Sequence, residues 1–286
     1  MSRIAHIEKK KSGLSWRETN QYLHSVNQFT ERASNKQSFA TVHVTGKAPI
    51  SLISLSDLHI GAQGFDHETL VRVTDEILST PDLYVGLFGD IVEMAIRLRS
   101  VAEVMNQSLT PQQQTYYARS WFEEIAPKVL FATWGNHDIE RQEQLAGYSD
   151  FADIFAANVI YYNSIGHLDL IVGEQTYKLA VSHRFRGHGM YNPAQGAVRY
   201  LMLDAPTREV AICGDSHRPG ICQFTHGETV KLAVTSGTLN TNSDYTKRKF
   251  SLYSHTNFPV IMFRGDEHHE FSAFWGLGPF LRATKG

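Results

Sequence analysis

The stretch S-L-I-S-L-S-D-L-H-I-G, residues 51–61, decides which fold the sequence predicts. A short apolar run ends abruptly in Asp57-Leu58-His59, the pattern of a buried strand with polar residues at its carboxyl end. Alternate residues of a strand share one face, so Asp57 and His59 would point the same way, about 6–7 Å apart along the strand. A carboxylate and an imidazole at that spacing can bind one cation, although a strand that merely ends in polar turn residues has the same pattern.

Four further apolar strands are predicted to end in the same kind of residue. Their ends read Gly89-Asp90, Gly135-Asn136-His137-Asp138, Ser182-His183 and Gly214-Asp215-Ser216-His217. Ligands of open α/β sheets bind beyond the carboxyl ends of the strands. Each strand end alone is a weak signal, but five of them with oxygen or nitrogen ligands predict a metal site.

Composition limits the class of protein. The 286 residues suffice for one large α/β domain or two smaller ones, and 42% hydrophobic with 20% charged residues is usual for a soluble globular protein. The two cysteines, Cys213 and Cys222, provide no disulfide framework, so we expect a reducing compartment and a cytoplasmic location. No apolar run approaches the roughly 18 residues of a membrane span, and residues 1–11 lack a secretory signal, so no membrane association is expected.

The net charge of −2 is unevenly distributed along the chain. Residues 1–38 contain seven Lys or Arg and three Glu, a net charge of +4, which leaves −6 for the remainder. Ser15 and Glu18 form a capping-box pattern, so this basic N-terminal extension is expected to contain a short helix. The extension could bind nucleic acid or pack as a tail on the body, and the second interpretation is favoured because short basic tails are common. Residues 39–286 would form the main domain.

The main domain is expected to alternate strands with helices and then to continue in hairpins. Single strands are predicted at 39–44, 83–88, 129–133 and 210–213, and hairpins at 167–172/176–182, 221–225/229–235 and 259–263/270–275. Helices are predicted after the N-caps Asp66 and Thr110, and at 97–105 and 151–157. A helical insertion, 94–127, would lie near the site, and residues 244–286 would form a C-terminal hairpin extension.

The motif series from residue 57 to residue 217 resembles that of the calcineurin-like metallophosphoesterases. That family has D-x-H, G-D-x-x-(D/N), G-N-H-(D/E), a lone His and G-H-x-H in this order, and G-N-H-D at 135–138 is the most specific match. Val234-Thr235-Ser236-Gly237-Thr238 is similar to the turn that follows the last motif. The resemblance implies an α/β fold, a four-layer sandwich of two mixed sheets flanked by helices, with a two-metal site at one edge.

The resemblance also implies the role of each site residue. Metal one would be bound by Asp57, His59 and His217, metal two by Asn136, His183 and Asp215, and both by Asp90 as the bridging ligand. His137 would contact the substrate phosphate, where it protonates the leaving oxygen or stabilises developing charge, and Glu93 would orient His137. Arg186 and His188 could bind the substrate phosphate, although a solvated basic loop is an equal alternative.

Asp215 stands where the family has a histidine. If it is a ligand, three carboxylates instead of two surround the metals, which favours harder ions. We therefore expect two divalent ions, Mn²⁺ before Fe, Zn²⁺ or Mg²⁺, and activity that depends on added Mn²⁺. Such a pair would neutralise phosphate oxygens and lower the pKa of the attacking water.

Three functions follow from this resemblance. The first is a phosphodiesterase that acts on nucleic acid, DNA or RNA, which the basic extension and Arg97, Arg99, Arg184 and Arg186 favour. The second is a phosphomonoesterase or cyclic-nucleotide phosphodiesterase for small molecules or phosphoproteins, which a pocket covered by the insertion would favour. The third is a non-catalytic binding module that keeps the fold. The sequence does not indicate an oligomeric state.

Overall fold

The structure is a computed structural model, and it describes most of the chain. The described residues are 15–33, 38–46, 48–95, 107–141, 154–155, 157–187, 189, 191–241, 256–266 and 268–284. His188 and the helix predicted at 97–105 lie outside them, as does most of the helix predicted at 151–157. Among the described residues no helix is long and apolar enough to cross a membrane.

The chain divides into two compact units, Met1–Lys36 and Gln37–Gly286. The first unit contains helix α1 (Trp16–Ala33). The predicted capping box is present, because the Ser15 hydroxyl accepts a hydrogen bond from the Glu18 N–H and the Glu18 carboxylate accepts one from the Ser15 N–H. The helix is longer than the short helix expected there.

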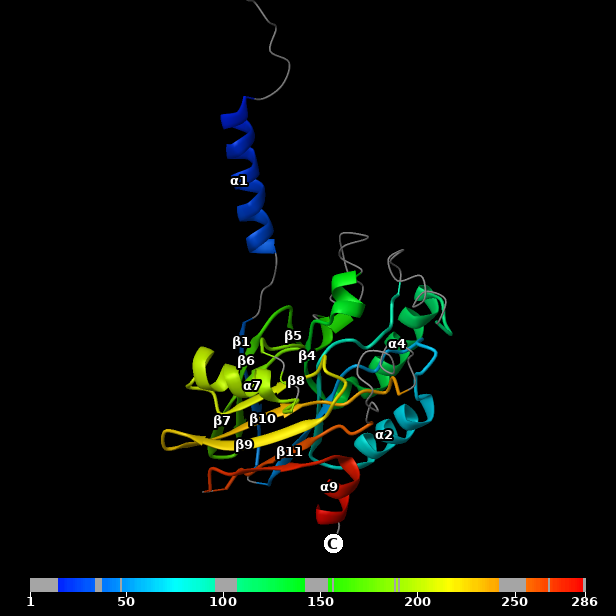
Figure 1. The fold of residues 1–286 in the computed structure, drawn as a ribbon, viewed down its shortest axis with the longest axis vertical. Helices are drawn as coiled ribbons and strands as arrows, with labels where there is room; N and C mark the ends of the chain where they lie inside the picture. The colour runs from blue at the N-terminus through cyan, green and yellow to red at the C-terminus, as the bar shows by residue number, and fades with distance from the viewer. Residues whose placement is uncertain are drawn as a thin grey trace, which may run out of the picture. The chain divides into compact units, whose positions relative to one another are not determined.

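The second unit contains two six-stranded sheets (Figure 1). The first sheet has the order β12 (Phe271–Phe274), β11 (Val260–Phe263), β2 (Ile50–Leu55), β3 (Leu83–Leu87), β4 (Val129–Thr133), β5 (Ile160–Tyr162). The second has the order β1 (Phe39–Val44), β6 (Gly166–Val172), β7 (Gln175–Val181), β8 (Val210–Cys213), β10 (Thr229–Thr235), β9 (Gly220–His226). Both sheets are mixed, with β2–β5 parallel in one and β7, β8 and β10 parallel in the other.

Strand β2 shows why the sheets stack. All six of its residues are buried, with Leu52 in the cluster between the sheets and Ile53 in the cluster beneath the helices. A strand covered on both faces needs an unbroken apolar run, which is what the sequence has there. The face of this sheet that carries Ile53 packs on helices α2 (His67–Ser79), α4 (Pro111–Ile125) and α9 (Leu277–Thr284). Helix α7 (Gln195–Arg199) covers the outer face of the other sheet (Figure 1). The predicted sandwich of two mixed sheets flanked by helices is confirmed.

The two predicted helix caps form as expected. The Asp66 carboxylate accepts a hydrogen bond from the Thr69 N–H. Thr110, which immediately precedes Pro111, forms a capping box with Gln113. The hairpin expected at the C-terminal end forms from β11 and β12, and β11 pairs antiparallel with β2. This hairpin is therefore part of the sheet that contains the D-L-H stretch. Strand β5 and helices α7 and α9 were not predicted.

Candidate metal centre

The polar residues after the strands converge because parallel strands of each sheet end at the same edge. Asp57, Asp90 and Asn136 follow β2, β3 and β4, and His183 and Asp215 follow β7 and β8. Backbone hydrogen bonds tie these loops together: the Asp57 N–H donates to the Gly89 carbonyl oxygen at 3.0 Å, and the Gly214 N–H donates to the His183 carbonyl oxygen at 2.9 Å. The centre is thus formed by both sheets.

Left-handed backbone conformations turn the side chains inward. Among the described residues seven non-glycine residues have a positive φ, and five of them are site residues: Asp57 (52°), His59 (51°), Asp90 (52°), Asp215 (64°) and His217 (55°). Such conformations cost energy for residues with a Cβ atom and concentrate at functional sites. The expectation that Asp57 and His59 share one face of a strand is wrong, because β2 ends at Leu55 and both residues lie in a loop.

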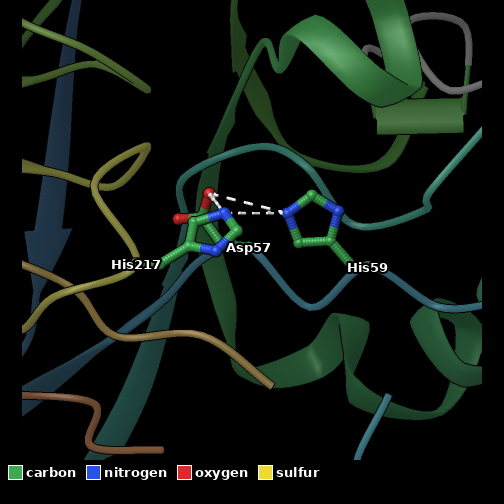
Figure 2. Close-up of side chains that lie close together, drawn as sticks. All are labelled: Asp57, His59 and His217. Atoms are coloured by element: carbon green, nitrogen blue, oxygen red, sulfur yellow. Dashed lines mark hydrogen bonds and ion pairs between the residues drawn. The ribbon is translucent and has the colours of Figure 1, made fainter. Parts of the chain in front are cut away.

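The first ligand group consists of Asp57, His59 and His217 (Figure 2). Oδ1 of Asp57 lies 3.3 Å from Nε2 of His217 and 4.0 Å from Nε2 of His59, and the two Nε2 atoms are 3.0 Å apart. Oδ2 of Asp57 accepts hydrogen bonds from the Ser56 hydroxyl and the Asp215 N–H, whereas Oδ1 is buried without a hydrogen-bond partner. A buried carboxylate oxygen in this state is costly, and a cation among the three side chains would satisfy it. The residues therefore fit a metal ion.

The second ligand group consists of Asp57, Asp90 and His183. Nε2 of His183 lies 3.4 Å from Oδ2 of Asp90, 3.1 Å from Oδ1 of Asn136 and 3.7 Å from Oδ1 of Asp215. Nδ1 of the same ring donates a 2.6 Å hydrogen bond to the Phe88 carbonyl oxygen, which directs Nε2 into the centre. The structure thus brings all seven expected ligands together, and Asp57 belongs to both of these groups. A third group of possible ligands, His59, Glu93 and His137, shares His59 with the first.

Glu93 contacts two histidines in different ways. Its Oε2 lies 2.7 Å from Nδ1 of His59, whereas its Oε1 is 3.6 Å from Nδ1 of His137. Nδ1 of His137 instead donates a 2.8 Å hydrogen bond to the Glu93 backbone carbonyl oxygen. The side chain of Glu93 therefore orients His59, and its backbone orients His137.

His137 lies beside the second ligand group. Its N–H donates to Oδ1 of Asp90 at 2.8 Å, its Nε2 lies 3.9 Å from Oδ2 of Asp90, and its ring packs edge-on against His59. Burial lowers the pKa of His137 to about 4, so its imidazole is neutral near pH 7 in the metal-free protein. Arg141, which the sequence analysis did not single out, contacts Nε2 of His137 at 3.0 Å. The sequence feature that could have predicted this contact is the position of Arg141 four residues after His137, because side chains at that spacing meet on a helical turn.

The predicted phosphate-binding residues lie on the loop after β7. Arg184 Nη1 is 3.9 Å from Oδ1 of Asp215, and its side chain is half exposed. Arg186 is exposed on the same loop, and His188 lies outside the described residues. The loop therefore places at least one arginine at the rim of the centre.

Comparison with known proteins identifies the class. The family model of the calcineurin-like phosphoesterases matches residues 50–270. The chain therefore belongs to the calcineurin-like phosphoesterase family, and it is a metal-dependent phosphoesterase. The predicted family resemblance is confirmed. No curated protein sequence matches the chain.

Several solved structures are similar to this chain at low identity. The calcineurin-like phosphoesterase YfkN from Bacillus subtilis is 14% identical, with a TM-score of 0.41 over 80% of this chain and 91% of that one. A conserved predicted phosphoesterase from Streptococcus pneumoniae is 16% identical (TM-score 0.32, 80% and 99% covered). The phosphopantetheinyl hydrolase from Mycobacterium tuberculosis is 13% identical (TM-score 0.34, 73% and 95% covered).

Glu93→Gln is expected to weaken metal binding. The amide can still accept the hydrogen bond from Nδ1 of His59 but no longer carries the negative charge that makes the imidazole a stronger ligand, and such changes cost about 10–100-fold in metal affinity. Titration of metal-free protein with Mn²⁺ measures the effect, and Glu123→Gln on the exposed face of α4 serves as the control. If Glu93 acted only through His137, turnover would fall while metal affinity stayed unchanged.

Metal binding should release protons near neutral pH. Burial opposes protonation of His59 and His183, but the carboxylates of Glu93 and Asp90 outweigh it and raise the pKa of His59 to about 9 and that of His183 to about 10. Both rings are therefore protonated on both nitrogens and positively charged at pH 7 in the metal-free protein. Each must lose one of these protons before a ring nitrogen can bind a metal ion. Calorimetry with Mn²⁺ in buffers of different ionisation enthalpy should show release of about two protons at pH 7 and tighter binding as the pH approaches 9. An affinity that does not change between pH 6 and pH 9 would contradict this assignment.

Proposed function

We propose that this phosphoesterase uses two divalent metal ions, Mn²⁺ first among them, to hydrolyse phosphodiester bonds in nucleic acid. The observation that carries the two-metal proposal is Asp57, which belongs to both ligand groups and has a buried Oδ1 without a hydrogen-bond partner. Asp57, His59 and His217 would hold one ion, and Asp90, Asn136, His183 and Asp215 the other. Bound ions of this kind polarise the phosphoryl group and make water more acidic.

Neighbouring protein groups hold the ligand side chains in the orientation that metal binding would require. Ser56 and the Asp215 N–H fix Oδ2 of Asp57, which leaves Oδ1 directed at the ligand group. Glu93 fixes the ring of His59, and the Phe88 carbonyl oxygen fixes that of His183. His137 faces the same centre and would contact the phosphoryl group of the substrate.

Nucleic acid is the favoured substrate because basic side chains lie at the rim of the centre and, separately, in residues 1–38. Arg184 lies at its rim, Arg186 is exposed on the same loop, and residues 1–38 have a net charge of +4. Phosphodiester backbones bind to such groups through their charge, independently of sequence. The charge of −6 on the remainder argues against a broad binding track, so contact would be confined to this rim and the extension.

A phosphomonoesterase or cyclic-nucleotide phosphodiesterase is the second candidate. The segment before α4 lies on the D-L-H-I-G loop, where the Ser108 N–H donates to the Gly61 carbonyl oxygen at 2.8 Å and Gln107 forms a bridge with Ala62. A covered pocket at this position would suit a small substrate better than a polymer. A binding module without catalysis is disfavoured because the full set of expected ligands converges.

Two model substrates separate these candidates. With Mn²⁺ added, we expect hydrolysis of bis-p-nitrophenyl phosphate and little hydrolysis of p-nitrophenyl phosphate; the reverse preference would favour the monoesterase. Turnover of single-stranded and double-stranded DNA follows, with and without residues 1–38. If removal of the extension changed neither the rate nor its salt dependence, the extension would have no role in nucleic-acid binding. Full activity of metal-stripped protein without added ions would refute the two-metal proposal.

A further inference from the structure

Arg141 is a mostly buried cation inside the candidate metal centre. Its Nη2 lies 3.0 Å from Nε2 of His137, and its Nη1 donates a 2.8 Å hydrogen bond to the Glu93 carbonyl oxygen. The side chain is only 16% exposed. Because the same carbonyl oxygen also accepts the hydrogen bond from Nδ1 of His137, Arg141 and His137 are fixed side by side.

Arg141 has a structural partner in the Glu93 carboxylate, whose Oε1 lies 3.8 Å from Nη1, but this contact does not involve Nη2. The Glu93 carbonyl oxygen is already paired with Nδ1 of His137, so a second donor is not needed to satisfy it. Burial of a guanidinium is costly, and the nearby Glu93 carboxylate offsets that cost on the Nη1 side. Within the centre, Nη2 lies against the ring nitrogen that is directed toward Asp90.

The charge balance of the centre indicates that Arg141 could attract a phosphate anion. Two divalent ions would bring four positive charges, which the carboxylates of Asp57, Asp90, Glu93 and Asp215 would balance with four negative ones. A centre balanced in this way has no net attraction for a phosphate anion, and one additional buried cation provides it. Arg184 is also near, but its side chain is 50% exposed, so solvent screens its charge more strongly.

We propose that Arg141 binds the phosphoryl group of the substrate, donating to an oxygen that faces away from the metal ions and toward His137. The inference rests on the proposed function, because it assigns a binding residue to that same site. Guanidinium N–H groups match the spacing of phosphate oxygens, and a neighbouring imidazole holds the fork in place before the substrate arrives. Arg141 would therefore be the principal anion-binding side chain, ahead of Arg186.

The test is calorimetric titration of the Mn²⁺-loaded full chain with inorganic phosphate. Arg141→Met, Arg141→Lys and the control Arg72→Met are compared with the unaltered protein, with bound Mn²⁺ measured for each. Arg72 is a suitable control because it lies on α2 with a 61% exposed side chain. Arg141→Met should weaken phosphate binding by about 10–100-fold at unchanged Mn²⁺ content, and Arg141→Lys by less, because it keeps the charge and loses the fork. Arg72→Met should change nothing.

Two results would overturn the inference. One is equal phosphate affinity in Arg141→Met and the unaltered protein. The other is a loss of phosphate binding that only follows a loss of bound Mn²⁺. If Arg141→Met does not fold, unchanged affinity in Arg141→Lys also counts against it. The proposed function fails separately: an unaltered protein that binds phosphate through Arg141 but hydrolyses no diester would refute the nuclease proposal and leave Arg141 as a phosphate ligand.

Discussion

Asp90→Asn is expected to reduce phosphoester hydrolysis by about 10³-fold or more, because it removes one of the charges that hold the second metal ion. Oδ2 of Asp90 lies 3.4 Å from Nε2 of His183, and Oδ1 accepts the His137 N–H, so the carboxylate joins the second ligand group to the G-N-H-D loop. Asparagine keeps the size and one acceptor oxygen but not the charge. Turnover and bound Mn²⁺ should therefore fall together.

The matched control for this substitution is Asp75→Asn on the exposed side of α2. It removes a carboxylate of the same kind outside the centre and should leave turnover and bound metal unchanged. Metal content measured by elemental analysis, beside the rate at saturating substrate, checks both proteins. Full turnover in Asp90→Asn, or lost turnover with two ions still bound, would contradict the role assigned to Asp90.

His137→Ala is expected to lower turnover by about 10²–10⁴-fold while bound Mn²⁺ stays unchanged. His137 is outside the first and second ligand groups, although it forms a third possible group with His59 and Glu93. Its Nδ1 is held by the Glu93 carbonyl oxygen and its Nε2 by Arg141, so neither ring nitrogen is needed by the two proposed ions. To protonate the leaving oxygen, Nε2 would first have to take up a proton when substrate binds, because the ring is neutral in the metal-free protein and Nε2 accepts from Arg141. Otherwise His137 would, together with Arg141, stabilise charge on the phosphoryl group. Either contribution is largest when the leaving group is a weak acid.

Rates for diesters with good and poor leaving groups therefore separate chemistry from binding. The loss in His137→Ala should be smaller for a nitrophenyl leaving group than for a phenyl or alkyl one. His67→Ala, on the exposed first turn of α2, is the control and should behave as the unaltered protein. Normal turnover of His137→Ala on a substrate with a poor leaving group would exclude the proposed role of His137.

The sequence predicts the fold well because apolar strands and helix caps are local signals. The all-buried run of β2, the Asp66 cap and the Thr110-Pro111 helix start form as predicted. Helix α9 was not predicted, because its range carries Gly278 and Pro279, which usually indicate a loop. The pairing of β11 with β2 is a contact between distant segments, and no local pattern reveals it.

Within the site, residue types were predictable and their geometry was not. The ligand candidates follow from polar residues at strand ends, but the positive φ at Asp57 and His59 depends on hydrogen bonds to the Gly89 and Asp90 carbonyl oxygens. These bonds exist only after β2 and β3 pair. The hydrogen bond of the Glu93 side chain to His59, and of its backbone carbonyl oxygen to His137, has the same origin.

Crystallography of the Mn²⁺-loaded protein, with anomalous data collected at the manganese absorption edge, tests the central claim most directly. The two-metal account predicts two anomalous peaks about 3.5–4 Å apart, one among Asp57, His59 and His217 and the other at Asp90, Asn136 and His183. No peak in this centre, or a single peak that does not contact Asp57, would contradict it.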